Sequence, residues 1–104
     1  MPAFIVLYRW KLKPGAEDSF VNAWSRITAQ LQASGGSLGS RLHRGSDHIW
    51  YGYAQWPNEQ TRRTAFESFI DRDLAERMKS AVAESMPEVV LECVADYLIP
   101  LEAA

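Results

Sequence analysis

The sequence predicts an α+β domain of the ferredoxin-like type, βαββαβ, in which helices cover one face of a four-stranded antiparallel sheet. Three observations support this prediction. The chain has 104 residues, which suits a single domain, residues 1–104, with one core. Apolar residues alternate in some segments and recur every three or four residues in others. Gly and Pro separate these segments, whose order is strand, helix, strand, strand, helix, strand.

The first strand is expected at residues 3–12 (AFIVLYRWKL), because β-branched and aromatic residues are concentrated there and Pro14 and Gly15 then break the run. Alternation places four side chains on one face of this strand: Phe4, Val6, Tyr8 and Trp10. The first helix follows, with apolar side chains at helical spacing: Phe20, Trp24, Ile27 and Leu31. Trp24 is interpreted as a core residue of this helix, which is expected to end at Gly35.

Residues 37–44 and 48–56 form the two strands of a predicted hairpin, joined by a short loop at residues 45–47. Pro57 ends the hairpin, and Asn58 is suited to cap a second helical region.

This second helical region is expected to reach about Ser85, with a break near Ser68. The last strand is predicted at residues 88–99 (EVVLECVADYLI). Cys93 is interpreted as an inert core residue of this strand. Three acidic residues are interpreted as protecting an edge strand from unwanted pairing: Glu88, Glu92 and Asp96.

The aromatic third strand (WYGYAQW) carries the most specific pattern. Large and small side chains alternate onto one face, which would leave a slot for a flat ligand between two indoles: Trp50, Gly52, Ala54 and Trp56. The other face carries Tyr51 and Tyr53, beside Ile5 and Leu7 of the first strand. An apolar patch of this size is rarely exposed on a monomer, so we expect a homodimer formed through this sheet face.

Composition excludes several functional classes. The net charge is −2, with 11 basic and 13 acidic residues, so a nucleic-acid or anionic-membrane partner is not expected. The single cysteine and the absence of a leader pattern predict a cytoplasmic protein. His43 and His48 show no metal-ligand spacing with Cys93 or with a carboxylate pair, so no metal is expected.

Three stretches, KPGAEDSFVNAW, GGSLGSRLHRG and YGYAQWPNEQ, resemble the antibiotic biosynthesis monooxygenase family. This resemblance implies a dimeric α+β barrel whose protomers each hold a pocket between sheet and helices. Its branches include cofactor-independent monooxygenases of aromatic polyketides, quinol oxygenases, haem-degrading enzymes and proteins without known activity.

The polyketide-tailoring branch matches best at Tyr53-Ala54-Gln55-Trp56, and its active-site tryptophan falls on Trp56. Two other polar positions of that branch differ here, an asparagine being replaced by Gly52 and a tyrosine by Arg62. The haem-degrading branch fits less well, since its strand-one asparagine falls on Tyr8.

Oxygenation without a cofactor requires an electron-rich substrate and a dry pocket with a few hydrogen-bond donors. We therefore predict Trp56 and Tyr8 as catalytic residues. The predicted substrate-binding residues are Trp10, Trp50, Gly52 and Arg62. The first hypothesis is a monooxygenase acting on an aromatic polyketide-like or quinol-like molecule, and the alternative is a non-catalytic binding or accessory protein. Plain packing for Trp56 and Tyr8, and a solvated helix position for Arg62, remain open.

Overall fold

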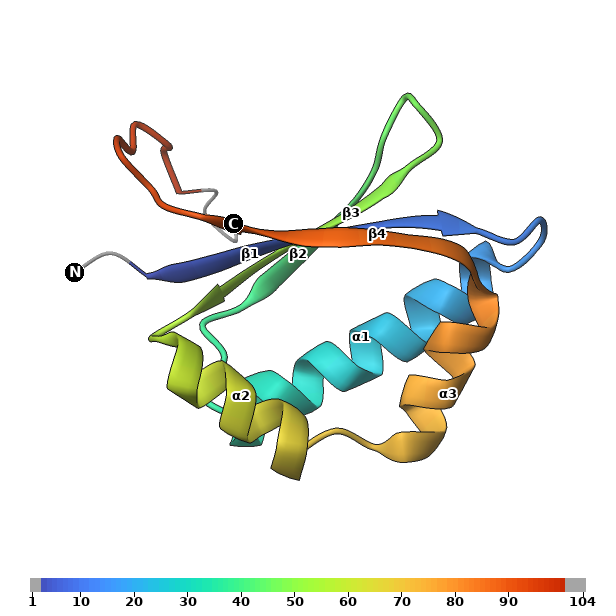
Figure 1. Ribbon diagram of the computed structural model, residues 1–104, viewed down its shortest axis with the longest axis horizontal. Coiled ribbons are helices and arrows are strands. Elements are labelled where there is room, and N and C mark those ends of the chain that lie inside the picture. The colour runs from blue at the N-terminus through green and yellow to red at the C-terminus, as the bar shows by residue number, and fades with distance from the viewer. Residues whose placement is uncertain (1–2, 101–104) are drawn as a thin grey trace.

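The computed structural model describes residues 3–100 and has the predicted ferredoxin-like architecture (Figure 1). Its elements are β1 (Phe4–Leu12), α1 (Glu17–Ser34), β2 (Ser40–Arg44), β3 (Trp50–Trp56), α2 (Glu59–Ser68), α3 (Arg72–Ala81) and β4 (Val82–Leu91). The strands form one antiparallel sheet in the order β2-β3-β1-β4. All three helices lie on one face of this sheet, as Figure 1 shows.

The register of β1 against β3 brings the inner-face aromatic residues together. Tyr8 lies opposite Gly52, and Trp10 lies opposite Trp50. The alternating residues of β3 are buried on this face: Trp50, Gly52, Ala54 and Trp56. Tyr51 and Tyr53, on the other face, are half-buried. The predicted alternation of β3 is therefore confirmed.

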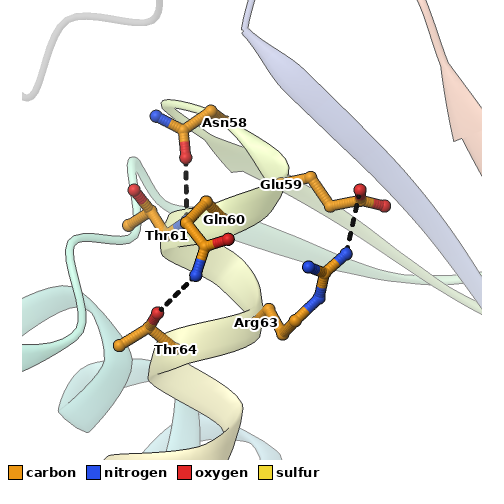
Figure 2. A network of polar contacts seen from close by, with 6 residues as sticks. All are labelled: Asn58, Glu59, Gln60, Thr61, Arg63 and Thr64. Atoms are coloured by element: carbon orange, nitrogen blue, oxygen red, sulfur yellow. Dashed lines mark hydrogen bonds and ion pairs between the residues drawn. The ribbon is translucent and has the colours of Figure 1, made fainter.

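The predicted break in the second helical region is confirmed, because α2 and α3 each begin at a capping residue. The Asn58 side-chain oxygen accepts a hydrogen bond from the Thr61 backbone N–H at 2.8 Å, as Figure 2 shows. Asp71 caps α3 by accepting from the backbone N–H groups of Asp73 and Leu74.

The hairpin strands are shorter than predicted. The loop between them extends to Ile49, since the Gly45 N–H donates to the Ile49 carbonyl at 2.7 Å and His48 has a positive φ of 66°. A residue in the left-handed region cannot continue an extended strand. The third strand consequently begins at Trp50 rather than at His48.

The predicted boundaries of the last strand are wrong at both ends. The chain leaves α3 at Ala81 and enters β4 at once, so Pro87 lies inside the strand instead of before it. A proline is tolerated there because β4 is an edge strand and the pairing is irregular at that point. Leu91 ends the strand because its partner is Ile5, near the start of β1.

Residues 92–99 form no strand, and in Figure 1 they lie on the side of the sheet away from the helices. Cys93 is exposed, so its interpretation as a core residue of a strand was wrong. Ile5 is only 3% exposed, so not all of the outer sheet face is open. Several apolar side chains of the segment are strongly exposed: Val94, Tyr97, Leu98 and Ile99.

Within residues 3–100, no helix combines the length and the apolar character that crossing a bilayer requires.

Candidate functional site

A cavity of about 300 Å³ lies between the sheet and the helices. Its sheet wall consists of Tyr8, Trp10, Ser40, Gly52, Ala54 and Trp56. The helices contribute mainly apolar residues: Trp24, Ile27, Leu31, Phe66, Ile70, Ala75 and Met78. Such a volume is at the lower end for small-molecule sites and suits a ligand of two or three fused rings.

A larger groove, of about 1090 Å³, lies on the other sheet face, between the strands and residues 93–98. We assign the candidate site to the smaller cavity, because its walls are regular elements and carry three indole rings. Stacking surfaces of this kind favour flat aromatic ligands.

Stacked aromatic rings set the shape of the sheet wall. The rings of Tyr8 and Trp10 are nearly parallel, with centroids 5.7 Å apart. Trp10 crosses above Gly52, where a Cβ atom would lie 2.9 Å from two atoms of the indole. Gly52 thus lines the cavity and also provides the space that Trp10 occupies. Close packing of Trp10 therefore explains why the aromatic strand has a glycine at position 52.

Trp50 does not line the cavity, although the sequence suggested that it forms one side of the slot. Its ring packs edge-on against Phe20 at 6.0 Å, and the Arg44 guanidinium lies 4.9 Å from its centroid. The indoles in the cavity wall are those of Trp56, Trp10 and Trp24. Trp24 was interpreted as core, and it is half-buried at this wall.

Trp56 is 1% exposed and packs edge-on against Phe66, with ring centroids 5.9 Å apart. Its indole N–H is buried and has no hydrogen-bond partner among residues 3–100. An unpaired buried donor is uncommon in folded proteins. A ligand oxygen could satisfy this donor if neighbouring side chains moved to admit it.

Arg62 does not line the cavity, but it contacts a residue that does. Its Nε donates to the Tyr8 hydroxyl oxygen at 3.0 Å, and its Nη2 donates to Glu88 Oε2 at 2.7 Å. The structure therefore links three elements through polar contacts: β1, α2 and β4. Glu88 was interpreted from the sequence as protecting an edge strand and was not predicted as a site residue, because its placement depends on an irregularity of β4 that the composition does not reveal.

Burial raises the pKa of the Tyr8 hydroxyl above its usual value of 10.0, although the hydrogen bond and charge of Arg62 oppose this effect. Burial acts to lower the pKa of Arg62, but its interactions with Tyr8 and Glu88 raise that pKa overall. At neutral pH the pair is a neutral phenol beside a cationic guanidinium.

The part of the chain that the structure describes contains no group of three His, Cys, Asp or Glu side chains placed to hold a metal. His43 and His48 belong to the β2–β3 hairpin and do not line the cavity.

No family model and no curated protein matches the sequence. Solved structures do match its fold. SnoaB, a cofactor-independent oxygenase from Streptomyces nogalater, has a TM-score of 0.75 at 17% identity, covering 97% of this chain and 100% of that one. A candidate antibiotic biosynthesis monooxygenase from Chloroflexus aurantiacus J-10-fl has a TM-score of 0.72 at 11% identity, and the match covers 94% of this chain and 99% of that one. A conserved protein from Methanosarcina mazei Go1 has a TM-score of 0.75 at 13% identity, and the match covers 88% of this chain and 92% of that one.

At these identities the likeness establishes a shared fold. The ferredoxin-like fold predicted for the single chain is confirmed.

Proposed function

We propose, on the premise that this chain has the fold of the oxygenase SnoaB, that it is a cofactor-independent monooxygenase of a flat aromatic polyketide-like or quinol-like molecule. The observation that carries the proposal is the aromatic cavity between the sheet and the helices, whose lining includes the hydrogen-bond donors Tyr8 and Trp56. Aromatic surface binds the rings, and the donors favour negative charge on a ligand oxygen.

The proposed chemistry uses electrons of the substrate itself. A substrate with a CH₂ group beside aromatic rings first loses a proton to solvent water, and the resulting anion passes an electron to O₂. Recombination of the two radicals forms a C–O bond, and the peroxide anion takes up a proton to give a hydroperoxide. Loss of water then converts this carbon to a carbonyl, so one oxygen atom enters the product and the other leaves as water. The mainly apolar lining of the cavity limits contact between the anion and water.

The proposed roles follow from the positions of the residues. Tyr8 and Trp56 are the catalytic donors, and Trp10 and Gly52 form the flat binding surface. Trp50 lies outside the cavity wall, where its ring contacts Phe20, and it has no proposed role in binding. Arg62 acts through Tyr8.

Oxygen uptake with anthrone, a three-ring compound with a reactive CH₂ group, tests this proposal. Loss of one donor to a developing anion slows catalysis by about tenfold or more, so Trp56→Phe should lower the rate by that amount. The control is Trp50→Phe, which changes an indole outside the cavity wall. Equal uptake with and without the wild-type protein, over a panel of hydroquinones and anthrones, would contradict the proposal.

The alternative is a binding or accessory protein on the same scaffold. One observation favours it: Gly52 and Arg62 occupy positions at which the resemblance implies polar pocket residues, and the cavity wall is consequently almost entirely apolar. Tight binding of anthrone under nitrogen, without oxygen uptake in air, would support this function over the first.

We also propose a cytoplasmic homodimer that associates through the outer sheet face. Half-buried Leu7, Tyr51 and Tyr53 on that face support this proposal, as do the exposed Tyr97 and Leu98 beside it. Burying such apolar surface against a second copy is favourable.

A further inference from the structure

A polar chain leads from the exposed edge strand to the cavity wall. Arg62 bonds to Tyr8 at 3.0 Å and forms an ion pair with Glu88 at 2.7 Å. The Arg62 side chain is only 14% exposed, whereas that of Glu88 is 45% exposed. A guanidinium that is largely removed from water needs fixed partners, and these two residues supply them.

The direction of the Tyr8 bond determines what Tyr8 can offer a ligand. A guanidinium has five N–H donors and no acceptor, so the Tyr8 oxygen accepts in this bond. The hydroxyl proton must therefore point elsewhere. No hydrogen bond donated by Tyr8 occurs within residues 3–100, so its O–H is free for an acceptor in the cavity that Tyr8 lines.

An irregularity of β4 brings Glu88 to this position. Leu7 pairs with Val89 and Arg9 pairs with Met86, so Pro87 and Glu88 both lie opposite Tyr8. Two residues opposite one form a β-bulge, which redirects side chains and is frequent beside functional sites. The Arg9 guanidinium donates to the Pro87 carbonyl at 3.1 Å and helps to hold the bulge.

We propose that Glu88 and Arg62 are positioning residues that keep the Tyr8 hydroxyl as a donor for one acceptor oxygen of the ligand, a carbonyl or ionised hydroxyl on a flat ring system. This inference rests on the aromatic ligand of the proposed function. The positive charge of Arg62 behind the phenol strengthens that donation and favours negative charge on the ligand oxygen.

The test compares two ligands that differ only in one carbonyl group: 1-tetralone, a two-ring ketone, and tetralin, the hydrocarbon with CH₂ at that position. Dissociation constants of both are measured by calorimetry for the wild type and for each variant. The readout is the preference, which is the tetralin constant divided by the 1-tetralone constant. A contribution of Arg62 or Glu88 to packing alone would change both constants and leave the preference unchanged.

Tyr8→Phe should lower the preference about fivefold, since it removes one donated hydrogen bond and leaves tetralin binding unchanged. Arg62→Gln and Glu88→Gln should each lower it by about twofold to fivefold. The matched controls, Arg63→Gln and Glu84→Gln, should leave it at the wild-type value. Arg63 is the exposed neighbour of Arg62 and pairs with Glu59 at 3.1 Å (Figure 2), and Glu84 is exposed on the same strand as Glu88.

An unchanged preference in Tyr8→Phe, or equal weakening of both ligands in the other two variants, would overturn the inference. Failure of 1-tetralone to bind the wild type would also overturn it. If Arg62→Gln does not fold, Arg62→Lys keeps the charge without the planar fork and should still lower the preference. A changed preference without oxygen uptake from anthrone would support this inference and contradict the oxygenase. Oxygen uptake from anthrone with no change in preference would support the oxygenase and contradict this inference.

Discussion

At the scale of single residues, Gly52 shows how a small side chain fixes the position of a large one. The Trp10 indole occupies the space in which a Cβ of residue 52 would lie, at 2.9 Å from two ring atoms. The same indole forms part of the cavity wall. A change at residue 52 therefore acts on stability and on ligand binding together.

Gly52→Ala should lower the free energy of unfolding by about 1–3 kcal/mol, because the new methyl group overpacks the wall. Urea denaturation measures this change. Trp10→Phe removes the ring atoms that clash, so the double variant should lose less stability than the sum of the two single variants. Strict additivity would show that Gly52 does not accommodate Trp10.

Tyr8 gives the stability of the protein a dependence on alkaline pH. Burial raises its pKa in the folded chain, so folding favours the protonated phenol. This contribution is complete below pH 10, the usual pKa of tyrosine, and is lost as the pH rises through the folded-state pKa.

The free energy of unfolding should therefore fall above about pH 10, and it should fall less steeply in Tyr8→Phe. Urea titrations between pH 8 and pH 11 would measure both slopes. The pKa of Tyr51 is also raised, by its hydrogen bond to Asp47. The slope in Tyr51→Phe therefore measures how much a tyrosine outside the cavity wall contributes to the same pH dependence. Identical slopes in the wild type and Tyr8→Phe would contradict the burial of the Tyr8 hydroxyl.

The residue scale also shows how far the sequence could predict the site. Alternation along β1 and β3 correctly brought Tyr8, Trp10, Gly52 and Trp56 to one face, because strand periodicity is local. The position of Trp50 was not predictable in this way, since it depends on where Phe20 of α1 packs. Partners as far apart in sequence as Arg62 and Glu88 require the tertiary structure.

At the scale of elements, caps and strand pairing set the boundaries. The start of α2 was predictable from the sequence, because Asn58 follows Pro57 directly and is a preferred capping residue. Its side chain accepts a hydrogen bond from the first turn of the helix (Figure 2). The boundaries of β4 were not predictable from the sequence. Pro87 suggested a break, yet an edge strand with a bulge accommodates it.

Asn58→Ala should lower the free energy of unfolding by about 1 kcal/mol, since an N-terminal backbone N–H of α2 then loses its cap. Thermal and urea unfolding measure this loss. Gln60→Ala is a suitable control, because it removes only an exposed side-chain bond to Thr64 and should have an effect below about 0.5 kcal/mol. Equal losses in the two variants would show that the cap contributes nothing specific.

At the scale of the whole molecule, the layer arrangement was predictable and the course of the C-terminal segment was not. The sequence of residues 92–99 has strand-like composition, but the last paired residue of β4, Leu91, already lies opposite Ile5, one residue from the start of β1. Composition favours a strand only where a neighbour can accept its hydrogen bonds.

The exposed segment provides a test of the proposed dimer. Light scattering at micromolar concentration should give about twice the chain mass of 11.8 kDa. Leu98→Asp should shift the protein toward the monomer, because a carboxylate would be buried in the interface. Val21→Asp, an exposed position on α1, should not. A monomeric wild type would contradict the dimer.

The unpaired indole N–H of Trp56 makes the stability of the fold a measure of cavity occupancy. Folding removes this donor from water, and no group in residues 3–100 accepts a hydrogen bond from it. Leaving the buried donor unpaired lowers the free energy of unfolding by about 1–3 kcal/mol. A ligand oxygen that reaches it recovers part of that cost and also stabilises the fold by mass action. The melting temperature can therefore rank compounds before any reaction is known, and the largest increases should come from flat molecules that carry an acceptor oxygen.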